Sequence, residues 1–249
     1  MLCFHGFGMH GKQFQQLEPE LGNKYTFWSF DLFFHKGTKL KDQTLNTVKA
    51  GLTKKALANL IAGFCTAHQI QRFSVIGYSM GTHYATAIAE ELPEMINEYI
   101  LAAPSSIKPG NIIRFFSRNK IGNKIIERTS LKGNLMVNLL TLIKRARIID
   151  AEGYRILLKE IETYELRFNL YANLTYLRFL LTDEAKLVHA LNNYSIRSVF
   201  IFGLHDKAYP PATGKALLPL IKNAEIINLN EGHELINKRF AKVLGDLLL

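Results

Sequence analysis

Short apolar runs alternate with longer segments of helical period along most of the chain. The apolar runs are rich in aromatic and β-branched residues, and they predict strands at Leu2–His5, Tyr25–Phe30, Phe73–Ile76, Tyr99–Ala102, Ser198–Phe202 and Glu225–Leu229. Apolar residues at every third or fourth position predict helices at Lys12–Leu21, Thr47–His68, Met80–Glu91, Ala212–Ile221 and Glu234–Leu248. This alternation is typical of an α/β fold in which helices cover both faces of a mostly parallel sheet.

The alternation is interrupted once, between residues 105 and 193. No strand of the same quality occurs there, and the pattern is that of several helices separated by glycines. A stretch of this length is too long for a loop. We therefore predict a core made of residues 1–104 and 194–249, and a helical cap inserted as residues 105–193 over the strand ends.

The composition fits one catalytic domain with an insertion. The chain has 249 residues, 48% of them hydrophobic, which is enough for a sizeable core. No uninterrupted apolar run reaches the roughly 18 residues of a membrane-spanning helix. The first residues do not show the basic segment, apolar core and cleavage site of a signal peptide, so we expect none.

The two cysteines, Cys3 and Cys65, lie in apolar segments without metal-ligand spacing. Free thiols of this kind predict a reducing compartment, and we expect a cytoplasmic protein.

The strongest chemical signal is the sequence Gly77-Tyr78-Ser79-Met80-Gly81, which joins a predicted strand to a predicted helix. A serine on such a sharp turn has a strained backbone, and side chains two residues to either side would collide, so glycines are needed there. The pentapeptide alone also fits a tight turn whose serine caps the helix. The strand before it and the helix after it favour a nucleophile.

A second motif, His5-Gly6-Phe7-Gly8, ends the first predicted strand. Backbone amides in such a turn can point at a developing oxyanion. The amides of Phe7 and Met80 together would supply the two donors of an oxyanion hole, and losing one such donor typically costs about 100-fold to 1000-fold in rate. His-Gly is by itself a common turn, so this interpretation depends on the serine motif.

These two motifs in this order resemble the alpha/beta-hydrolase superfamily. In that family an acid follows the serine on the loop after a later strand, and a histidine follows the final strand. Asp206 and His233 stand at those places. The resemblance therefore implies a triad in which Ser79 attacks, His233 takes its proton and Asp206 fixes the imidazole tautomer. It implies an acyl-enzyme intermediate and no cofactor or metal.

Other polar residues near these motifs fit structural roles better. His5 matches the oxyanion-loop histidine of the family, His83 lies one turn into the helix after Ser79, and His205 precedes the predicted acid. Asp31 follows the second predicted strand, where the resemblance implies that it organises a turn. The chain also departs from the family, because the usual two strands before the His-Gly strand are missing. We expect an exposed sheet edge there.

Charge and apolar residues are mixed in the predicted cap. The formal net charge is +10, and the stretch from Lys108 to Lys132 has seven basic residues against Glu127 alone, interleaved with isoleucine and phenylalanine. Such a segment could contact an anionic membrane surface, or its apolar face could cover the active site with its lysines in water. No zinc-finger spacing, RNA-recognition sequence or phosphate-binding loop is present, so we predict no nucleic-acid partner.

An aromatic and leucine-rich stretch, Tyr164–Leu181, predicts an apolar lining for the cap. We therefore predict a hydrolase that cleaves a carboxylic ester or thioester of a small-molecule apolar acyl substrate. A carbon-carbon bond hydrolase with the same triad is the nearest alternative. A binding protein that kept the fold without the activity is the alternative from another class.

Overall fold

The computed structural model describes residues 1–248, apart from the side chains of residues 152, 153 and 156. The chain forms two compact units. We call the first the sheet unit, which consists of Met1–Leu32, Leu52–Gly110 and Phe179–Leu249. We call the second the helical unit, which consists of Phe33–Gly51 and Asn111–Arg178.

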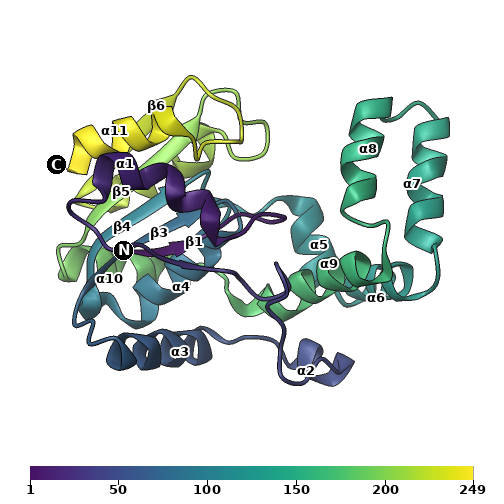
Figure 1. Ribbon diagram of the computed structural model, residues 1–249, viewed down its shortest axis with the longest axis horizontal. Coiled ribbons are helices and arrows are strands. Elements are labelled where there is room, and N and C mark those ends of the chain that lie inside the picture. Colours follow the sequence, from purple (N-terminus) through teal and green to yellow (C-terminus); the bar gives the residue numbers. More distant parts are fainter. Residues whose placement is uncertain (249) are drawn as a thin grey trace. The chain divides into compact units, whose positions relative to one another are not determined.

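The sheet unit is built on six parallel strands in the order β2-β1-β3-β4-β5-β6 (Figure 1). In chain order these strands are β1 (Leu2–Phe4), β2 (Trp28–Phe30), β3 (Phe73–Tyr78), β4 (Ile96–Ala102), β5 (Arg197–Gly203) and β6 (Ala224–Leu229). The helices of this unit are α1 (Glu18–Leu21), α3 (Lys54–Ala67), α4 (Gly81–Glu91), α10 (Glu184–Asn193) and α11 (Lys238–Leu248). The predicted α/β class with a mostly parallel sheet is confirmed.

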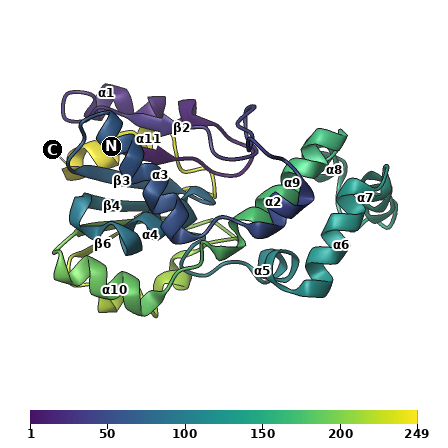
Figure 2. The same ribbon diagram turned by 90° about the horizontal axis from the view of Figure 1, so that it is seen from below.

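Helices cover both faces of the sheet. In Figures 1 and 2, α1 and α11 lie on one face, while α3, α4 and α10 lie on the other. Successive side chains of a strand point to opposite faces, so Cys3 packs with α1 and α11 in one core cluster, whereas the ring of the next residue, Phe4, stacks on Tyr84 of α4. Every residue of β3 is buried, which explains why its sequence is mostly apolar and does not alternate with polar residues.

Three predicted helices differ from the structure. The segment Lys12–Leu21 is a 3-10 helix, Gly11–Leu17, followed by the short helix α1. The segment Thr47–His68 is two helices, because Gly51 has a φ of +77° and Thr53 caps a new start by accepting a hydrogen bond from the Ala56 amide. The segment Ala212–Ile221 forms only two short 3-10 turns, Pro211–Gly214 and Leu218–Leu220. Pro219 lacks an amide donor and does not fit a helix interior.

The helical unit has its own small core. Its helices are α2 (Leu45–Ala50), α5 (Asn111–Arg118), α6 (Lys120–Leu131), α7 (Leu135–Arg145), α8 (Ala151–Lys159) and α9 (Tyr164–Tyr176). Phe34 and Val48 pack with Tyr171 of α9. The buried guanidinium of Arg167 donates to the carbonyls of Ile161 and Glu162, which fixes the connection from α8 to α9.

The boundaries of the two units differ from the predicted core and cap. Residues 33–51 fall in the helical unit, where Lys49 pairs with Glu127 and Lys39 pairs with Glu165. Residues 105–110 and 179–193 fall in the sheet unit, where the Asp183 amide donates to the carboxylate of Glu90. These ties join residues that are distant in sequence, so a local pattern cannot reveal them.

Strand β2 forms one edge of the sheet, because it pairs with β1 alone among the described strands. On this edge strand, the ring of Trp28 packs edge-on against Phe64, and its centre lies 4.5 Å from the centre of the His68 ring.

In the described part of the chain, we find no helix that combines the length and the apolar character needed to cross a bilayer.

Candidate active site

Ser79 lies at the turn between β3 and α4. Its φ is +48°, a left-handed value that residues other than glycine rarely adopt. The strained backbone is held from both sides: its amide donates to the Ala102 carbonyl at 2.9 Å, and its carbonyl accepts from the hydroxyls of Thr82 and Ser105 at 2.6 and 2.8 Å. Strain of this kind persists only where the surroundings enforce it.

The two glycines of the motif lie where no side chain fits. A Cβ at Gly81 would lie 1.9 Å from the Phe4 carbonyl oxygen, and a Cβ at Gly77 would lie 2.7 Å from the Cα of Thr82. Both obstacles are backbone atoms, which cannot move aside as a flexible side chain would. The crowding expected from the sequence is therefore present, and it brings the start of α4 close against β1.

His233 connects the serine to a buried carboxylate. Its Nε2 lies 3.0 Å from Ser79 Oγ, and its Nδ1 lies 2.8 Å from Asp206 Oδ2. Asp206 follows β5 and His233 follows β6, so three carboxyl ends of parallel strands bring the groups together. The structure thus unites the three side chains that the sequence singled out.

The two contacts of His233 are those expected for a single tautomer of its ring. An ionised carboxylate only accepts hydrogen bonds, so Nδ1 of His233 donates to Asp206. The lone pair of Nε2 then faces Ser79 and can accept its hydroxyl proton. The second oxygen of Asp206 accepts from the amides of Ala208 and Tyr209 at 2.8 and 3.0 Å. The carboxylate is therefore oriented by three donors.

Tyr78 holds the histidine loop, a role that sequence reasoning missed. Its hydroxyl donates to the backbone carbonyl of His233 at 2.9 Å. Burial, with the nearby Glu234 and Asp206 carboxylates, raises the pKa of Tyr78 to about 12. The hydroxyl therefore stays a donor at neutral pH. The Gly-x-Ser-x-Gly motif leaves the residue before the serine unspecified. The only sequence signal for Tyr78 was its position at the end of a buried strand.

The predicted oxyanion loop lies beside Ser79. A Cβ built on Gly6 would lie 3.5 Å from the Cβ of Ser79, so the chain entering Phe7 passes next to the serine. Met80 directly precedes the first residue of α4, and amides at a helix N-terminus favour negative charge. Phe7 and Met80 are thus both adjacent to residues that lie at the serine turn.

The other polar residues weighed from the sequence have structural contacts. His5 accepts from the Leu32 amide at 3.0 Å and contacts the Gly6 carbonyl at 2.7 Å. Asp31 accepts from the Gly11 amide at 2.7 Å, which agrees with its role in a turn. His83 contacts the Leu180 carbonyl and His205 contacts Asn230. None of these contacts involves Ser79.

The cysteines do not offer a competing nucleophile. Burial raises the pKa of the Cys3 thiol to about 12 and also raises the pKa of Cys65. Both thiols are therefore protonated and unreactive at neutral pH. Within the described residues, no group of three or more His, Cys, Asp or Glu side chains is arranged to hold a metal ion.

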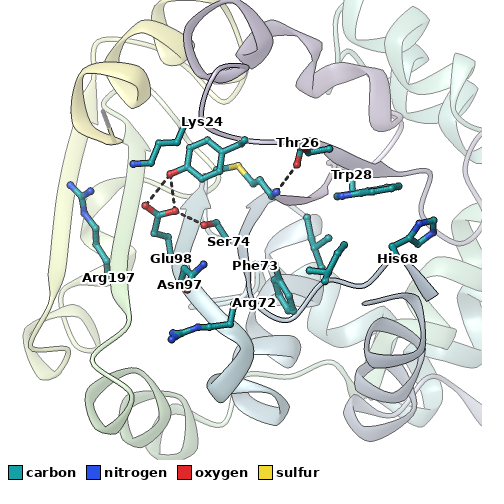
Figure 3. A pocket seen from close by; sticks show the side chains of 14 residues that line it. Lys24, Thr26, Trp28, His68, Arg72, Phe73, Ser74, Asn97, Glu98 and Arg197 are labelled. Carbon is teal, nitrogen blue, oxygen red and sulfur yellow. Dashed lines mark hydrogen bonds between the residues drawn. The ribbon is translucent and has the colours of Figure 1, made fainter. Parts of the chain in front are cut away.

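A cavity of about 730 Å³ lies at the opposite end of the sheet, where β1, β3, β4 and β5 begin. Figure 3 shows the Glu98 carboxylate in this cavity, which accepts from the hydroxyls of Tyr25 and Ser74. Arg197, on its rim, pairs with Glu225 outside it. The cavity contains none of the residues around Ser79.

Comparisons with known proteins agree with this architecture. Residues 1–120 match the family model of the alpha/beta hydrolase fold. A thermophilic esterase from Thermogutta terrifontis superposes with a TM-score of 0.71 at 17% identity, over 99% of this chain and 88% of that chain. The thioesterase domain from the curacin biosynthetic pathway has a TM-score of 0.62 at 17% identity, over 99% of this chain and 89% of that chain.

A meta-cleavage product hydrolase from Pseudomonas fluorescens IP01 superposes with a TM-score of 0.62 at 17% identity, over 98% of this chain and 88% of that chain. No curated protein matches the chain at a significant level. At such identities the likeness shows the fold, and the fold hosts several reactions. The alpha/beta-hydrolase fold that the sequence predicted is confirmed.

Proposed function

We propose that this chain, which has the alpha/beta-hydrolase fold and matches that family's model over residues 1–120, is a serine hydrolase that cleaves a carboxylic ester or thioester of an apolar acyl substrate. In this proposal Ser79 is the nucleophile, His233 the general base and Asp206 the acid that orients it. The observation that carries the proposal is the unbroken contact from Ser79 Oγ through the imidazole to the buried Asp206 carboxylate.

The proposed reaction has two halves. His233 Nε2 takes the proton of Ser79 as Oγ bonds to the substrate carbonyl carbon, and the imidazolium that forms is stabilised by Asp206. The tetrahedral intermediate expels the alcohol or thiol, which receives the proton from His233, and an acyl-serine remains. Water then attacks the acyl-serine with His233 again as base, which releases the carboxylic acid and restores the hydroxyl.

The backbone would stabilise the charge of the tetrahedral intermediate. The amides of Phe7 and Met80 are the proposed donors to its oxyanion, and Met80 also contributes the positive end of α4. Since the amides are fixed by the turn at Ser79 and by the loop beside it, no reorganisation is needed when the charge appears. Such fixed donors are the largest catalytic contribution in many acyl-transfer enzymes.

An apolar acyl group is proposed because exposed apolar side chains flank the site. Phe7 is 40% exposed on the loop beside Ser79, and Leu204 is 53% exposed two residues before Asp206. Small-molecule sites are lined mostly by apolar side chains around a few polar groups. A carbon-carbon bond hydrolase would need the same triad, and it is separated from the ester reaction by experiment.

The test compares the purified protein with Ser79→Ala on nitrophenyl esters, acyl thioesters and vinylogous diketones. We expect ester or thioester turnover that falls at least about 10⁴-fold in the variant, because the attacking oxygen is gone. Ser74→Ala is the matched control, since Ser74 lies on the same strand but contacts Glu98 at the other end. A fluorophosphonate probe should label the wild type and Ser74→Ala but not Ser79→Ala.

Each other outcome has a defined meaning. Turnover of the diketones without turnover of any ester would assign the carbon-carbon bond reaction to the same triad. Equal turnover by the wild type and Ser79→Ala would contradict the assignment of the nucleophile. Absence of both turnover and labelling, while a control serine hydrolase is labelled, would favour a binding protein that kept the fold.

A further inference from the structure

The charge of the protein is divided unequally between its two units. The helical unit has 17 Lys and Arg against 7 Asp and Glu, whereas the sheet unit has 14 against 14. The entire formal net charge of +10 therefore belongs to the helical unit, which is the smaller of the two. General solubility charge would be spread over both units, so this division calls for a local cause.

The excess is concentrated in α5 to α8. Residues 111–159 contain 11 Lys and Arg against 3 Asp and Glu. Every lysine and arginine from Arg114 to Lys159 is exposed. Glu127, one of the three acids, already pairs with Lys49 outside this stretch. The stretch therefore presents a strong positive field to water.

The same helices also expose large apolar side chains. Among the described side chains, 12 of the 19 large hydrophobic residues that are exposed lie in the helical unit. On α7, Leu135, Leu139 and Leu142 recur on one helical face and are 49%, 50% and 57% exposed. On α6, Ile121 and Ile125 are 70% and 44% exposed. Exposed apolar side chains that gather on one region of a protein often mark an interaction surface.

These apolar faces are additional to those that build the unit. Ile126 of α6 and Leu140 of α7 are only 7% exposed. In addition, α7 packs on α6 and on α8 (Figure 1). Each helix thus buries one apolar face and leaves another in water. A helix with spare apolar residues among lysines and arginines has the composition of one that lies in a lipid interface.

We propose that the exposed side chains of α5 to α8 form a surface that binds an anionic lipid bilayer. Phosphate headgroups would neutralise the lysines and arginines, and the exposed leucine and isoleucine chains would enter the boundary between headgroups and acyl chains. We call this set of side chains the basic apolar surface. The proposal concerns a second site, and it does not depend on the hydrolase function of Ser79.

Two other partners fit the observations less well. A second copy of the chain would bring another helical unit of the same charge, and repulsion between the two would oppose contact through this surface. A nucleic acid would neutralise the charge but would leave the exposed leucines in water, since phosphate contacts do not need them. An anionic bilayer uses both properties.

The experiment measures sedimentation of the full chain with vesicles of phosphatidylglycerol and phosphatidylcholine, and with vesicles of phosphatidylcholine alone. We expect binding to the anionic vesicles at low salt, weaker binding at high salt because ions screen the headgroups, and little binding to the neutral vesicles. Lys120→Glu/Lys124→Glu should weaken binding at least about tenfold, since each basic residue near an anionic surface contributes about fivefold.

A second pair of variants tests the apolar contribution. Leu139→Ser/Leu142→Ser should weaken vesicle binding about tenfold or more by removing the chains that would enter the interface. The matched control is Leu60→Ser/Leu220→Ser, which removes leucines of the sheet unit that are 55% and 56% exposed. All four side chains are already in water, so circular dichroism should show that each variant is folded.

The outcomes separate the alternatives. Failure of the wild type to sediment with anionic vesicles at low salt would overturn the proposal. Equal losses in the α7 variant and in its sheet-unit control would also overturn it, because binding would not be local. Binding to a polyanion such as single-stranded RNA that is unchanged in Leu139→Ser/Leu142→Ser would point to a nucleic-acid surface instead. Ser79→Ala should bind vesicles like the wild type.

Discussion

The sheet unit and the helical unit use apolar residues in opposite ways. In the sheet unit they fill the interior, so that all of β3 and most of β4 and β5 are buried. In the helical unit a small core around Tyr171 suffices, and many apolar side chains remain in water beside lysines and arginines. The tightly packed sheet unit is therefore suited to holding reacting groups in fixed positions, whereas the helical unit exposes apolar and basic side chains that could bind a partner.

The largest test of this comparison asks whether chemistry depends on the sheet unit alone. Asp206→Asn should lower kcat about 10⁴-fold, because the amide no longer fixes the His233 tautomer. Lys124→Glu, in the helical unit, should leave kcat for a short soluble ester unchanged. Steady-state kinetics with such an ester measures both. An equal loss of kcat in the two variants would show that catalysis also depends on the helical unit.

The next test concerns how tightly the sheet unit is packed. Gly81→Ala should lower the free energy of unfolding by about 3 kcal/mol, because the added methyl group would meet the Phe4 carbonyl. Gly63→Ala is the control: it lies inside α3 with open space around it, and it should raise stability by up to about 1 kcal/mol. Urea unfolding compares them. A Gly81→Ala protein as stable as the wild type would show that the turn is looser than described.

A smaller effect is expected at the hydroxyl that holds the histidine loop. Tyr78→Phe should lower kcat about fivefold, the equivalent of one ordinary hydrogen bond of about 1 kcal/mol. Tyr25→Phe removes a hydroxyl from the same unit at the far end of the sheet, where it contacts Glu98, and should leave kcat unchanged. If both variants lose activity equally, the loss reflects general stability rather than positioning of His233.

The smallest effect concerns acid stability. Burial lowers the pKa of His83 below its ordinary value of 6.5, so the unfolded chain binds a proton that the folded chain releases. Stability should therefore fall as pH drops below about 6.5 and continue to fall until the folded pKa is reached. His83→Gln should flatten this slope, and the exposed His189→Gln should not. Urea midpoints between pH 5 and pH 7.5 measure the difference, and an unchanged slope in His83→Gln would contradict it.

Sequence reasoning was strongest where the signal was local. The six predicted strands all occur, because buried parallel strands produce apolar runs that stand out from helical segments. The resemblance to the alpha/beta-hydrolase family also identified Ser79, Asp206 and His233 by their order after successive strands. Their mutual distances follow from the sheet order, which brings the ends of β3, β5 and β6 to the same edge.

Long-range contacts could not be predicted from the pattern. Residues 33–51 join the helical unit through Phe34 and Val48, whose partners are more than a hundred residues away on α9. The donors around Asp206 are backbone amides, which every residue carries and no composition reveals. Within Tyr164–Leu181, which was predicted to line the cap, Tyr171 is fully buried and packs in the core of the helical unit.

Trp28 is the single tryptophan of the chain, and it stands at the corner where β2 meets α3. Its fluorescence therefore follows the sheet unit and is silent about the helical unit, while far-ultraviolet circular dichroism follows the helices of both. Heating one sample while recording the two signals shows whether the units melt as one cooperative body or in succession. Trp28 is thus an intrinsic fluorescent reporter of the sheet unit, and no label needs to be attached.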